Sequence, residues 1–182
     1  MIQLEFIQKI DISERPFKGS KEAPVTIAVF SDYQCPYCAR LEPVLQQVLN
    51  KYPKDIKIVL KHFPLPMHKF ARKASAATLA AAKQGKFWQF HEETFKNLRT
   101  LNDAKVQKIA QELGLNLEQF NNDLKDPAIQ KRINEDINNG RQAGVRGTPA
   151  IFVNGKLLKN RSLAGFQRLI ELELKKTSTT SR

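Results

Sequence analysis

The two cysteines constrain the fold of this chain more than any other feature of its sequence. Cys35 and Cys38 are the only cysteines among 182 residues, and two residues separate them. An apolar run of strand length, residues 25–30, precedes the pair, and apolar residues at helical spacing follow from Pro36 onward. A thiol pair at the junction of a strand and a helix is the pattern of a redox-active dithiol.

The position of Cys35 at the start of a helix predicts a thiol that ionises easily. The positive end of the helix dipole and the free backbone N–H groups of the first turn both stabilise a thiolate. Pro36 suits the first turn because the N–H that proline lacks has no partner there. We therefore expect the pKa of Cys35 to lie in the acidic part of the roughly 3.5 to 7.5 range of such thiols.

The first third of the chain predicts a β-α-β unit. Apolar residues recur at intervals of three and four from Pro36 to Tyr52, and Pro43 is expected to kink this helix. Apolar residues recur at every second position from Ile56 to Leu60, and residues 56–63 predict a second strand. A connection of this length makes the two strands parallel.

The remainder predicts a helical insertion followed by a β-β-α unit. Helix boundaries in the insertion are expected at the capping or terminating residues Gly85, Asn102, Gly114, Asn116 and Asp126. Residues 150–153 then read as a strand, Asn154-Gly155 as a hairpin turn, and residues 156–158 as the returning strand. Ser162 is expected to cap a last helix.

The net charge of +12 invites a comparison with nucleic-acid-binding proteins. The basic excess is spread along the chain, although residues 142–182 hold 8 basic and 2 acidic residues. There is no long basic run and no basic-aromatic motif, so we expect a solvated basic surface and no nucleic-acid partner. No apolar run reaches the roughly 20 residues of a membrane helix, and residues 1–15 do not read as a signal peptide.

Four local motifs, taken together, resemble the DsbA-like family of thiol–disulfide oxidoreductases. They are Phe30–Cys38, Lys61–Pro66, the segment Gly85-Lys86-Phe87-Trp88-x-x-His91, and Gly147–Ala150. The resemblance spans roughly residues 24–174. It implies an α/β protein with a thioredoxin fold, of order β-α-β then β-β-α with a central mixed sheet, and an inserted all-helical domain.

The resemblance sets the expected domain boundaries. Residues 20–65 and 142–176 would form the thioredoxin-like domain, and residues 66–141 the inserted helical domain. Residues 1–19 would form an extension, in which the alternating apolar residues Ile2, Leu4, Phe6, Ile10 and Ile12 suit short edge strands. Lys18–Ser20 reads as a turn, and residues 177–182 as a loose polar tail.

The resemblance also implies roles for the site residues. Cys35 would be the exposed nucleophile that forms the mixed disulfide, and Cys38 the more buried resolving thiol. Pro36 and Tyr37 would tune the redox potential from between them.

Thr148 and Pro149 would carry a cis peptide bond that faces the disulfide. A cis bond is physically reasonable because an X-Pro bond loses most of the preference for trans. The Thr148 backbone could pair with an extended substrate strand.

One position departs from the family. Many relatives carry a glutamate six residues before the nucleophile, where this chain has Val29. That glutamate would accept the proton of the resolving thiol, so the proton route is open to question. Glu42, one helical turn after Cys38, is a candidate substitute, with a solvated surface carboxylate as the alternative reading.

Other readings of the same residues remain open. Cys35, Cys38, His62 and His68 could together bind zinc, although a spacing of 23 residues between Cys38 and His62 is long for a zinc finger. His62, His68 and His91 are expected to have structural roles. The basic residues Arg146, Lys156, Lys159 and Arg161 could form a docking patch near the active site, or a solvated face.

The sequence therefore leads to an expected function. We expect a monomeric dithiol oxidase that introduces disulfides into exported proteins, with the Cys35–Cys38 disulfide as its only redox group and no metal. Its partners would be reduced or unfolded substrate proteins and a membrane-bound thiol oxidase that re-oxidises it. The location would be extracytoplasmic, with the signal peptide absent from the given sequence. The alternatives are a disulfide reductase or isomerase, and a non-catalytic binding module of the same fold.

Overall fold

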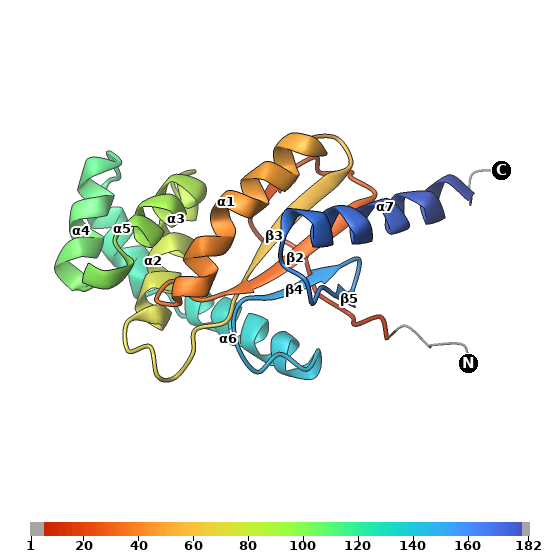
Figure 1. The fold of residues 1–182 in the computed structure, drawn as a ribbon. Helices are drawn as coiled ribbons and strands as arrows, with labels where there is room; N and C mark the ends of the chain where they lie inside the picture. Colours follow the sequence, from red (N-terminus) through yellow and green to blue (C-terminus); the bar gives the residue numbers. More distant parts are fainter. Residues whose placement is uncertain (1–5, 180–182) are drawn as a thin grey trace.

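A five-stranded mixed sheet, in the order β1-β3-β2-β4-β5, forms the centre of the protein in the computed structural model, which describes residues 6–179 (Figure 1). β2 and β3 are parallel, and the other neighbouring pairs are antiparallel. The strands are β1 Phe17–Gly19, β2 Val25–Ser31, β3 Ile56–His62, β4 Ala150–Val153 and β5 Lys156–Leu157. The predicted thioredoxin fold with its parallel first pair is confirmed.

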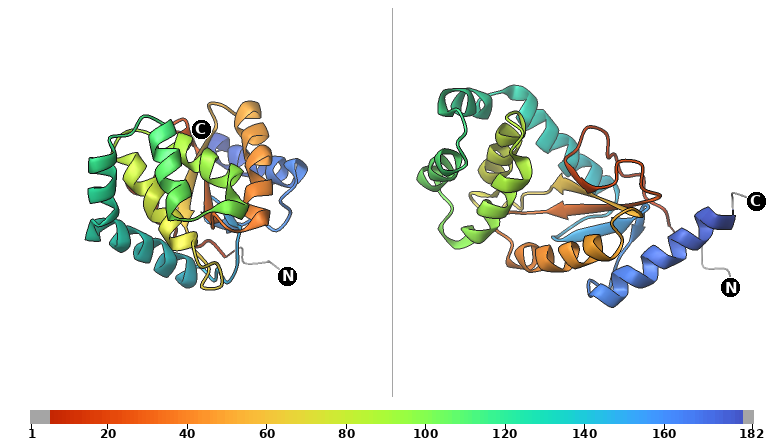
Figure 2. Two further views of the ribbon diagram at one scale, coloured as in Figure 1. Left: turned by 90° about the vertical axis from the view of Figure 1, so that its left-hand side faces the viewer. Right: turned by 90° about the horizontal axis from the view of Figure 1, so that it is seen from above.

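Helices cover both faces of the sheet and extend beyond one end of it (Figures 1 and 2). α1 and α7 lie on one face, α6 crosses the other, and α2 to α5 gather at the end of the sheet near the start of α1. The helices are α1 Pro36–Lys51, α2 Ala71–Ala82, α3 Phe87–Lys96, the short 3-10 helix η1 Leu98–Thr100, α4 Asp103–Glu112, α5 Leu117–Leu124, α6 Pro127–Gln142 and α7 Leu163–Thr179.

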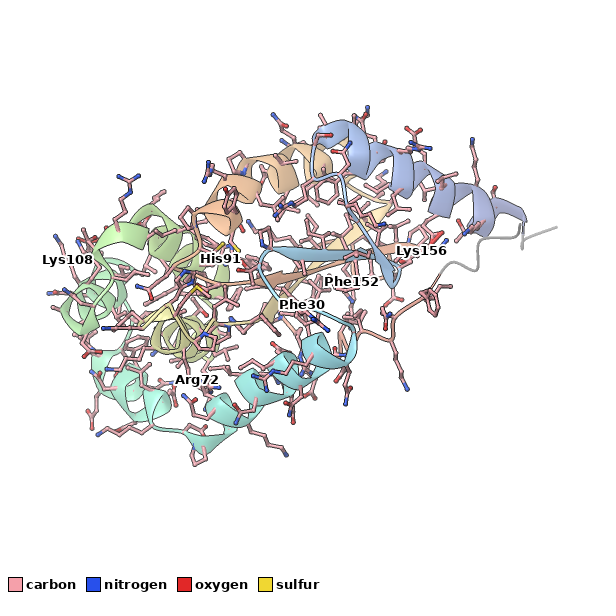
Figure 3. All side chains as sticks on the ribbon, turned by 60° about the horizontal axis from the view of Figure 1, so that its bottom comes forward. Phe30, Arg72, His91, Lys108, Phe152 and Lys156 are labelled. Carbon is pink, nitrogen blue, oxygen red and sulfur yellow. The ribbon has the colours of Figure 1, made fainter. Side chains whose placement is uncertain are left out.

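The two faces of the sheet have separate apolar cores because side chains of a strand alternate between its faces. Ile27 and Val29 of β2 pack with α1 and α7, where Phe166 and Ile170 are fully buried. Phe30 points the other way, and its ring meets that of Phe152 edge-on at 5.8 Å (Figure 3). The helix that begins at the cysteine pair, α1, is thus packed against this first face of β2.

The helix boundaries follow the capping residues that the sequence predicts. The side chains of Asn102, Asn116 and Asp126 accept hydrogen bonds from the first turns of α4, α5 and α6. Ser162 likewise accepts the N–H of Gly165 at 3.2 Å. α1 continues through Pro43 to Lys51.

Helix α6 belongs to both the insertion and the sheet. Ile129 and Ile133, in its first half, are buried with the helices of the insertion. Further along, a Cβ atom on Gly140 would lie only 2.8 Å from the Phe63 ring, so glycine permits this close approach of helix and sheet. One continuous helix therefore links the two parts of the molecule.

A buried cluster of charged groups holds the N-terminal extension to this helix. Asp136 of α6 is fully buried, and its Oδ1 lies 3.1 Å from Nζ of Lys61 and 3.0 Å from Nε of Arg15. The other carboxylate oxygen accepts the backbone N–H of His62 at 2.9 Å. Burial lowers the pKa of Lys61, and the carboxylate of Asp136 opposes that shift. The patterns of the sequence do not predict this cluster.

The chain ends differ from the predictions in two places. Residues 17–19 form the edge strand β1 and not the start of a turn, because they pair with residues 57–59 of β3. Ile10 and Ile12 lie outside any strand, while Ile2 and Leu4 lie outside the described residues. The tail is helical as far as Thr179, since α7 continues past the predicted end at residue 176. None of the helices between residues 6 and 179 has the length and apolar character needed to cross a bilayer.

Candidate active site

The cysteine pair lies where the sequence predicts, between β2 and α1. Cys35 is the residue that caps α1, and Pro36 occupies the first position of the helix. The carbonyl of Cys35 accepts the N–H groups of Cys38 and Ala39, which closes the first turn. Both thiols are in the reduced, unpaired form. Two sulfurs that face each other across a single helical turn can form a disulfide.

Cys35 is less exposed than the sequence analysis expected. Its relative exposure is 4%, against 1% for Cys38. The loop that carries Thr148 covers it: the Cys35 thiol donates to the Thr148 carbonyl, with Sγ and oxygen 3.5 Å apart. The expected difference in burial between the two thiols is therefore present but small.

Thr148 and Pro149 lie beside the cysteine pair and are joined by a cis peptide bond. Their placement follows from the sheet, because β4 is antiparallel to β2 and Ala150 pairs with Phe30. Residues before Ala150 therefore continue along the end of β2 that leads to Cys35. This register brings together segments that are 113 residues apart in the sequence.

The pKa values of the two thiols are shifted in opposite directions. The pKa of Cys35 is lowered from 9.0 to about 5, chiefly by a hydrogen bond from the Cys38 thiol, with help from Thr148 and from the N–H groups of Cys38 and Tyr37. The hydrogen bond with Cys35, together with burial, raises the pKa of Cys38. The expected acidic Cys35 is thus present, although Cys38 contributes more to its acidity than the helix start does.

Asp32 fixes the loop beside the cysteine pair, a role that sequence reasoning missed. Its buried carboxylate accepts the N–H groups of Gln34 and Leu65, both at 2.7 Å, and lies 2.8 Å from Nδ1 of His68. The Gln34 side chain accepts the N–H of Phe70 at 2.7 Å. An aspartate that bonds the N–H two residues later is a common turn pattern, and this was the available signal.

Glu42 is not the solvated surface carboxylate of the alternative reading. Its side chain is 25% exposed, and Oε2 lies 3.0 Å from Nε2 of the fully buried His91. The other ring nitrogen of His91 lies 2.8 Å from the hydroxyl of Tyr33. Val29 is core, as predicted, and it lines with Glu42 a small cavity of about 20 Å³, which has room for about one water molecule.

The residues of the alternative zinc reading do not converge. His68 bonds Asp32, and His62 is buried with its ring 6.1 Å from those of Tyr33 and Phe87. Burial lowers the pKa of His62 to about 4, so this ring is neutral. Among residues 6–179 no group of three or more histidine, cysteine or acidic side chains is placed to hold a metal ion. The expectation of a metal-free site stays a prediction.

The remaining predicted residues lie apart from one another. Tyr37 is 61% exposed, and the Arg40 guanidinium lies 4.5 Å from the centre of its ring. Of the suggested docking patch, Lys156 lies at the other end of the sheet from His91 (Figure 3), and its ammonium is 3.6 Å from Glu173. A docking role for the other basic residues stays a prediction.

The chain is similar to a known protein family and to solved structures of that fold. Residues 12–172 match the sequence model of the Thioredoxin family. A thioredoxin-like oxidoreductase from Silicibacter pomeroyi DSS-3 has 28% sequence identity and a TM-score of 0.79, over 88% of this chain and 92% of that one. Oxidised BdbD from Bacillus subtilis has 24% identity and a TM-score of 0.80, over 94% and 98% of the two chains, and shows the shared fold.

Relatives among curated proteins are longer. The Na(+)/H(+) antiporter NhaA 3 of Salinispora tropica is 34% identical over 154 residues, which are 84% of this chain and 24% of the antiporter. NhaA of Herminiimonas arsenicoxydans is 32% identical over 142 residues, 78% of this chain and 22% of that protein. The chain spans about a quarter of the length of these curated relatives. The fold, the cysteine pair and the family match together place the chain in the thioredoxin family.

Proposed function

We propose that this protein is a dithiol oxidase that gives its Cys35–Cys38 disulfide to reduced substrate proteins. The observation that carries this proposal is the pKa of about 5 for Cys35 beside a raised pKa for Cys38. A thiol with a low pKa is a good leaving group and stabilises the reduced enzyme. The oxidised enzyme is then the stronger oxidant, so electrons move from substrate to enzyme.

The reaction proceeds in two exchanges. A substrate thiolate attacks Sγ of Cys35, the Cys35–Cys38 bond breaks, and Cys38 leaves with the electron pair and takes up a proton. The second substrate thiolate then attacks the substrate sulfur of the mixed disulfide, and Cys35 leaves as a thiolate. The substrate loses two electrons and two protons. The enzyme keeps both electrons and one proton, and the other proton goes to solvent.

Thr148 and Pro149 orient the substrate in this scheme. The Thr148 carbonyl lies 3.5 Å from Sγ of Cys35, so a chain that pairs with the Thr148 backbone passes directly over the sulfur. Proline at position 149 offers no N–H that would compete for hydrogen bonds. Pro36 and Tyr37, between the two thiols, adjust the redox potential.

We further propose that Glu42 supplies the proton that Cys38 takes up. Glu42 lies four residues after Cys38, and residues at this spacing lie on the same face of a helix. Its carboxylate shares a small cavity with Val29, the position from which a glutamate would act in related proteins. His91 holds that carboxylate from the side away from solvent.

The Glu42 route has its own test. Glu42→Gln should slow the formation of the mixed disulfide, the step in which Cys38 takes up its proton, and change the pH profile of that step, while Glu118→Gln on exposed α5 should do neither. If both variants keep the native pH profile, Glu42 does not carry the proton.

The partners follow from the same chemistry. Reduced or unfolded exported proteins are the substrates, and a membrane-bound thiol oxidase restores the disulfide. The protein works outside the cytoplasm as a monomer, and it needs no metal and no redox group other than the disulfide. Its similarity to part of the chains named as antiporters agrees with a place of action at a membrane face.

The redox potential of the Cys35–Cys38 pair tests the proposal. Equilibration with glutathione should give a potential well above that of thioredoxin, about −270 mV, and toward that of strong oxidants, about −120 mV. Oxidation of a reduced model protein should be faster than insulin reduction or the repair of scrambled disulfides. A potential near the thioredoxin value would instead identify a reductase, and no activity in any assay would identify a binding module.

A further inference from the structure

A groove leads away from the cysteine pair between α1 and the end of α3. One wall is the first turn of α1, with Pro36, Ala39 and Arg40. The other wall is the segment 95–100, which includes the end of α3 and η1. The groove has a volume of about 540 Å³. Pro36, at one end of its lining, directly follows Cys35 in the chain.

The charge of this groove has one sign. Arg40, Lys96 and Arg99 line it, and no acidic side chain does. Lys96 is 3.0 Å from Glu93. Arg40 has only a hydrogen bond to the Pro36 carbonyl and its contact with Tyr37, and in the described part of the chain Arg99 forms no ion pair. Two cations therefore face the groove without a neutralising carboxylate.

The groove continues along α1 with a different charge. A second hollow of about 410 Å³ shares Ala39, Phe95 and Lys96 with the first and extends to Gln46. Glu42 and Glu92 line this part together with Lys18 and Lys96, so both signs of charge are present. The helix from Pro36 to Gln46 rises about 15 Å, which equals four or five residues of an extended peptide. The basic section covers the half nearest the sulfur.

We propose that this groove, which runs from Pro36 to Gln46, binds four or five residues of the substrate that flank its reacting cysteine and selects acidic residues next to that cysteine. The inference rests on the proposed thiol–disulfide exchange and names the substrate class for that site. Charge complementarity identifies the bound peptide. Arg40 and Arg99 attract a segment rich in Asp or Glu, whereas they repel a basic segment. The apolar side chains of Ala39 and Phe95 pack against the peptide between the charges.

Model peptides can test this preference directly. Each peptide carries a cysteine pair with five flanking residues, rich in aspartate, glutamine or lysine, placed on either side of the pair. For the side that enters the groove, kcat/KM for peptide oxidation should fall about fivefold from acidic to neutral and about fivefold again to basic peptides, a ratio typical of an exposed ion pair. High salt should reduce these ratios. Equal rates for the three compositions on both sides would overturn the proposal.

Charge reversal identifies the groove as the cause. Arg99→Glu should abolish or invert the preference, because η1 then presents a carboxylate to the peptide. Lys108→Glu makes the same change of net charge on α4, where the side chain is 63% exposed and pairs only with Glu112 (Figure 3), and should keep the preference. An unchanged preference in Arg99→Glu would show that the groove does not read the charge.

Peptide binding to a variant that cannot react tests the acidic selectivity separately from the proposed oxidase activity. Cys35→Ser cannot form the mixed disulfide, so the affinity of the labelled peptides for this variant, measured by fluorescence anisotropy, reports the groove alone. Acidic peptides should bind about fivefold more tightly than neutral ones even if the native protein proves to be a reductase. Oxidation of every peptide at one rate, with equal affinities for Cys35→Ser, would leave the oxidase standing and remove the acidic selectivity.

Discussion

Two clusters of buried ionisable groups lie near the ends of the adjacent strands β2 and β3, and they are built on opposite principles. At the end of β3, Lys61, Arg15 and Asp136 are almost fully buried, and each charge meets an opposite charge at 3.0 or 3.1 Å. After β2, Cys35 and Cys38 are just as buried, but they have no cation within hydrogen-bond distance and share one proton between them. Burial alone therefore does not make a group reactive.

The difference lies in what satisfies the charge. Removing one member of a buried ion cluster leaves its partners uncompensated, so such a cluster stabilises one conformation. In the thiol pair, the negative charge on Cys35 is stabilised mainly by a hydrogen bond from the Cys38 thiol. Cys38 is also the group that forms the disulfide bond with Cys35. The first cluster fixes the N-terminal extension, and the second can exchange partners.

The largest effect is expected at the nucleophile. Cys35→Ser should lower the rate of disulfide transfer by about a thousandfold or more, because Cys38, the remaining thiol, is more buried and its pKa is raised. Cys38→Ser should form that mixed disulfide and fail to release it, which non-reducing electrophoresis will show. If Cys38→Ser traps nothing and Cys35→Ser does, the two roles are reversed.

The ion cluster should respond in stability and not in reactivity. Asp136→Ala should lower the free energy of unfolding by about 3–5 kcal/mol, since Lys61 and Arg15 are left as buried, unpaired charges. Asp103→Ala breaks a pair with Lys73 whose side chains are 78% and 62% exposed, and it should cost at most about 1 kcal/mol. Urea unfolding measures both. The contrast between the clusters is broken if Asp136→Ala also shifts the pKa of Cys35.

The thiol pair should make the free energy of unfolding depend on pH. Folding lowers the pKa of Cys35 from 9.0 to about 5, so the thiolate stabilises the reduced protein fully above pH 9 and not at all below pH 5. The raised pKa of Cys38 has an effect only above pH 9. The stability difference between the reduced native protein and Cys35→Ser should therefore shrink as pH falls from 9 to 5. A difference that does not change with pH over this range would contradict the low pKa.

A smaller effect is expected at Thr148. Thr148 is one of the groups that lower the pKa of Cys35, after the Cys38 thiol. Thr148→Val removes the hydroxyl and keeps the shape, so the pKa of Cys35 should rise and the thiolate absorbance should titrate at higher pH. Thr100→Val, at an exposed threonine of η1, serves as the matched control. An unchanged titration in Thr148→Val would assign the acidity to Cys38 and the helix start alone.

Local features of the sequence account for much of this structure. The helix caps, the Asn154-Gly155 turn and the position of the cysteine pair follow from short patterns, and the cis bond before Pro149 was implied by the family resemblance. The ion pair between Lys61 and Asp136 could not be predicted in this way, since 75 residues separate them and the motif that begins at Lys61 does not indicate a partner on α6. The contact of Glu42 with His91 escaped for the same reason: helical spacing places Glu42 near Cys38 but does not reveal a partner from α3.

The edge strand β1 was missed because its three residues include a glycine and no alternation of apolar side chains. It forms because the extension is held in place on both sides, by β3 and by the buried Arg15. Tertiary contacts therefore decided a local structure for which the sequence indicated a turn.

Helix α6 packs both on the sheet and on the helices of the insertion, which include the far wall of the proposed substrate groove. A swing of those helices toward α1 would have to pull Asp136 away from Lys61 or lift Gly140 from the ring of Phe63. Both separations are costly in a packed interior. Under the proposed function, substrates are therefore selected by a groove whose shape exists before they bind.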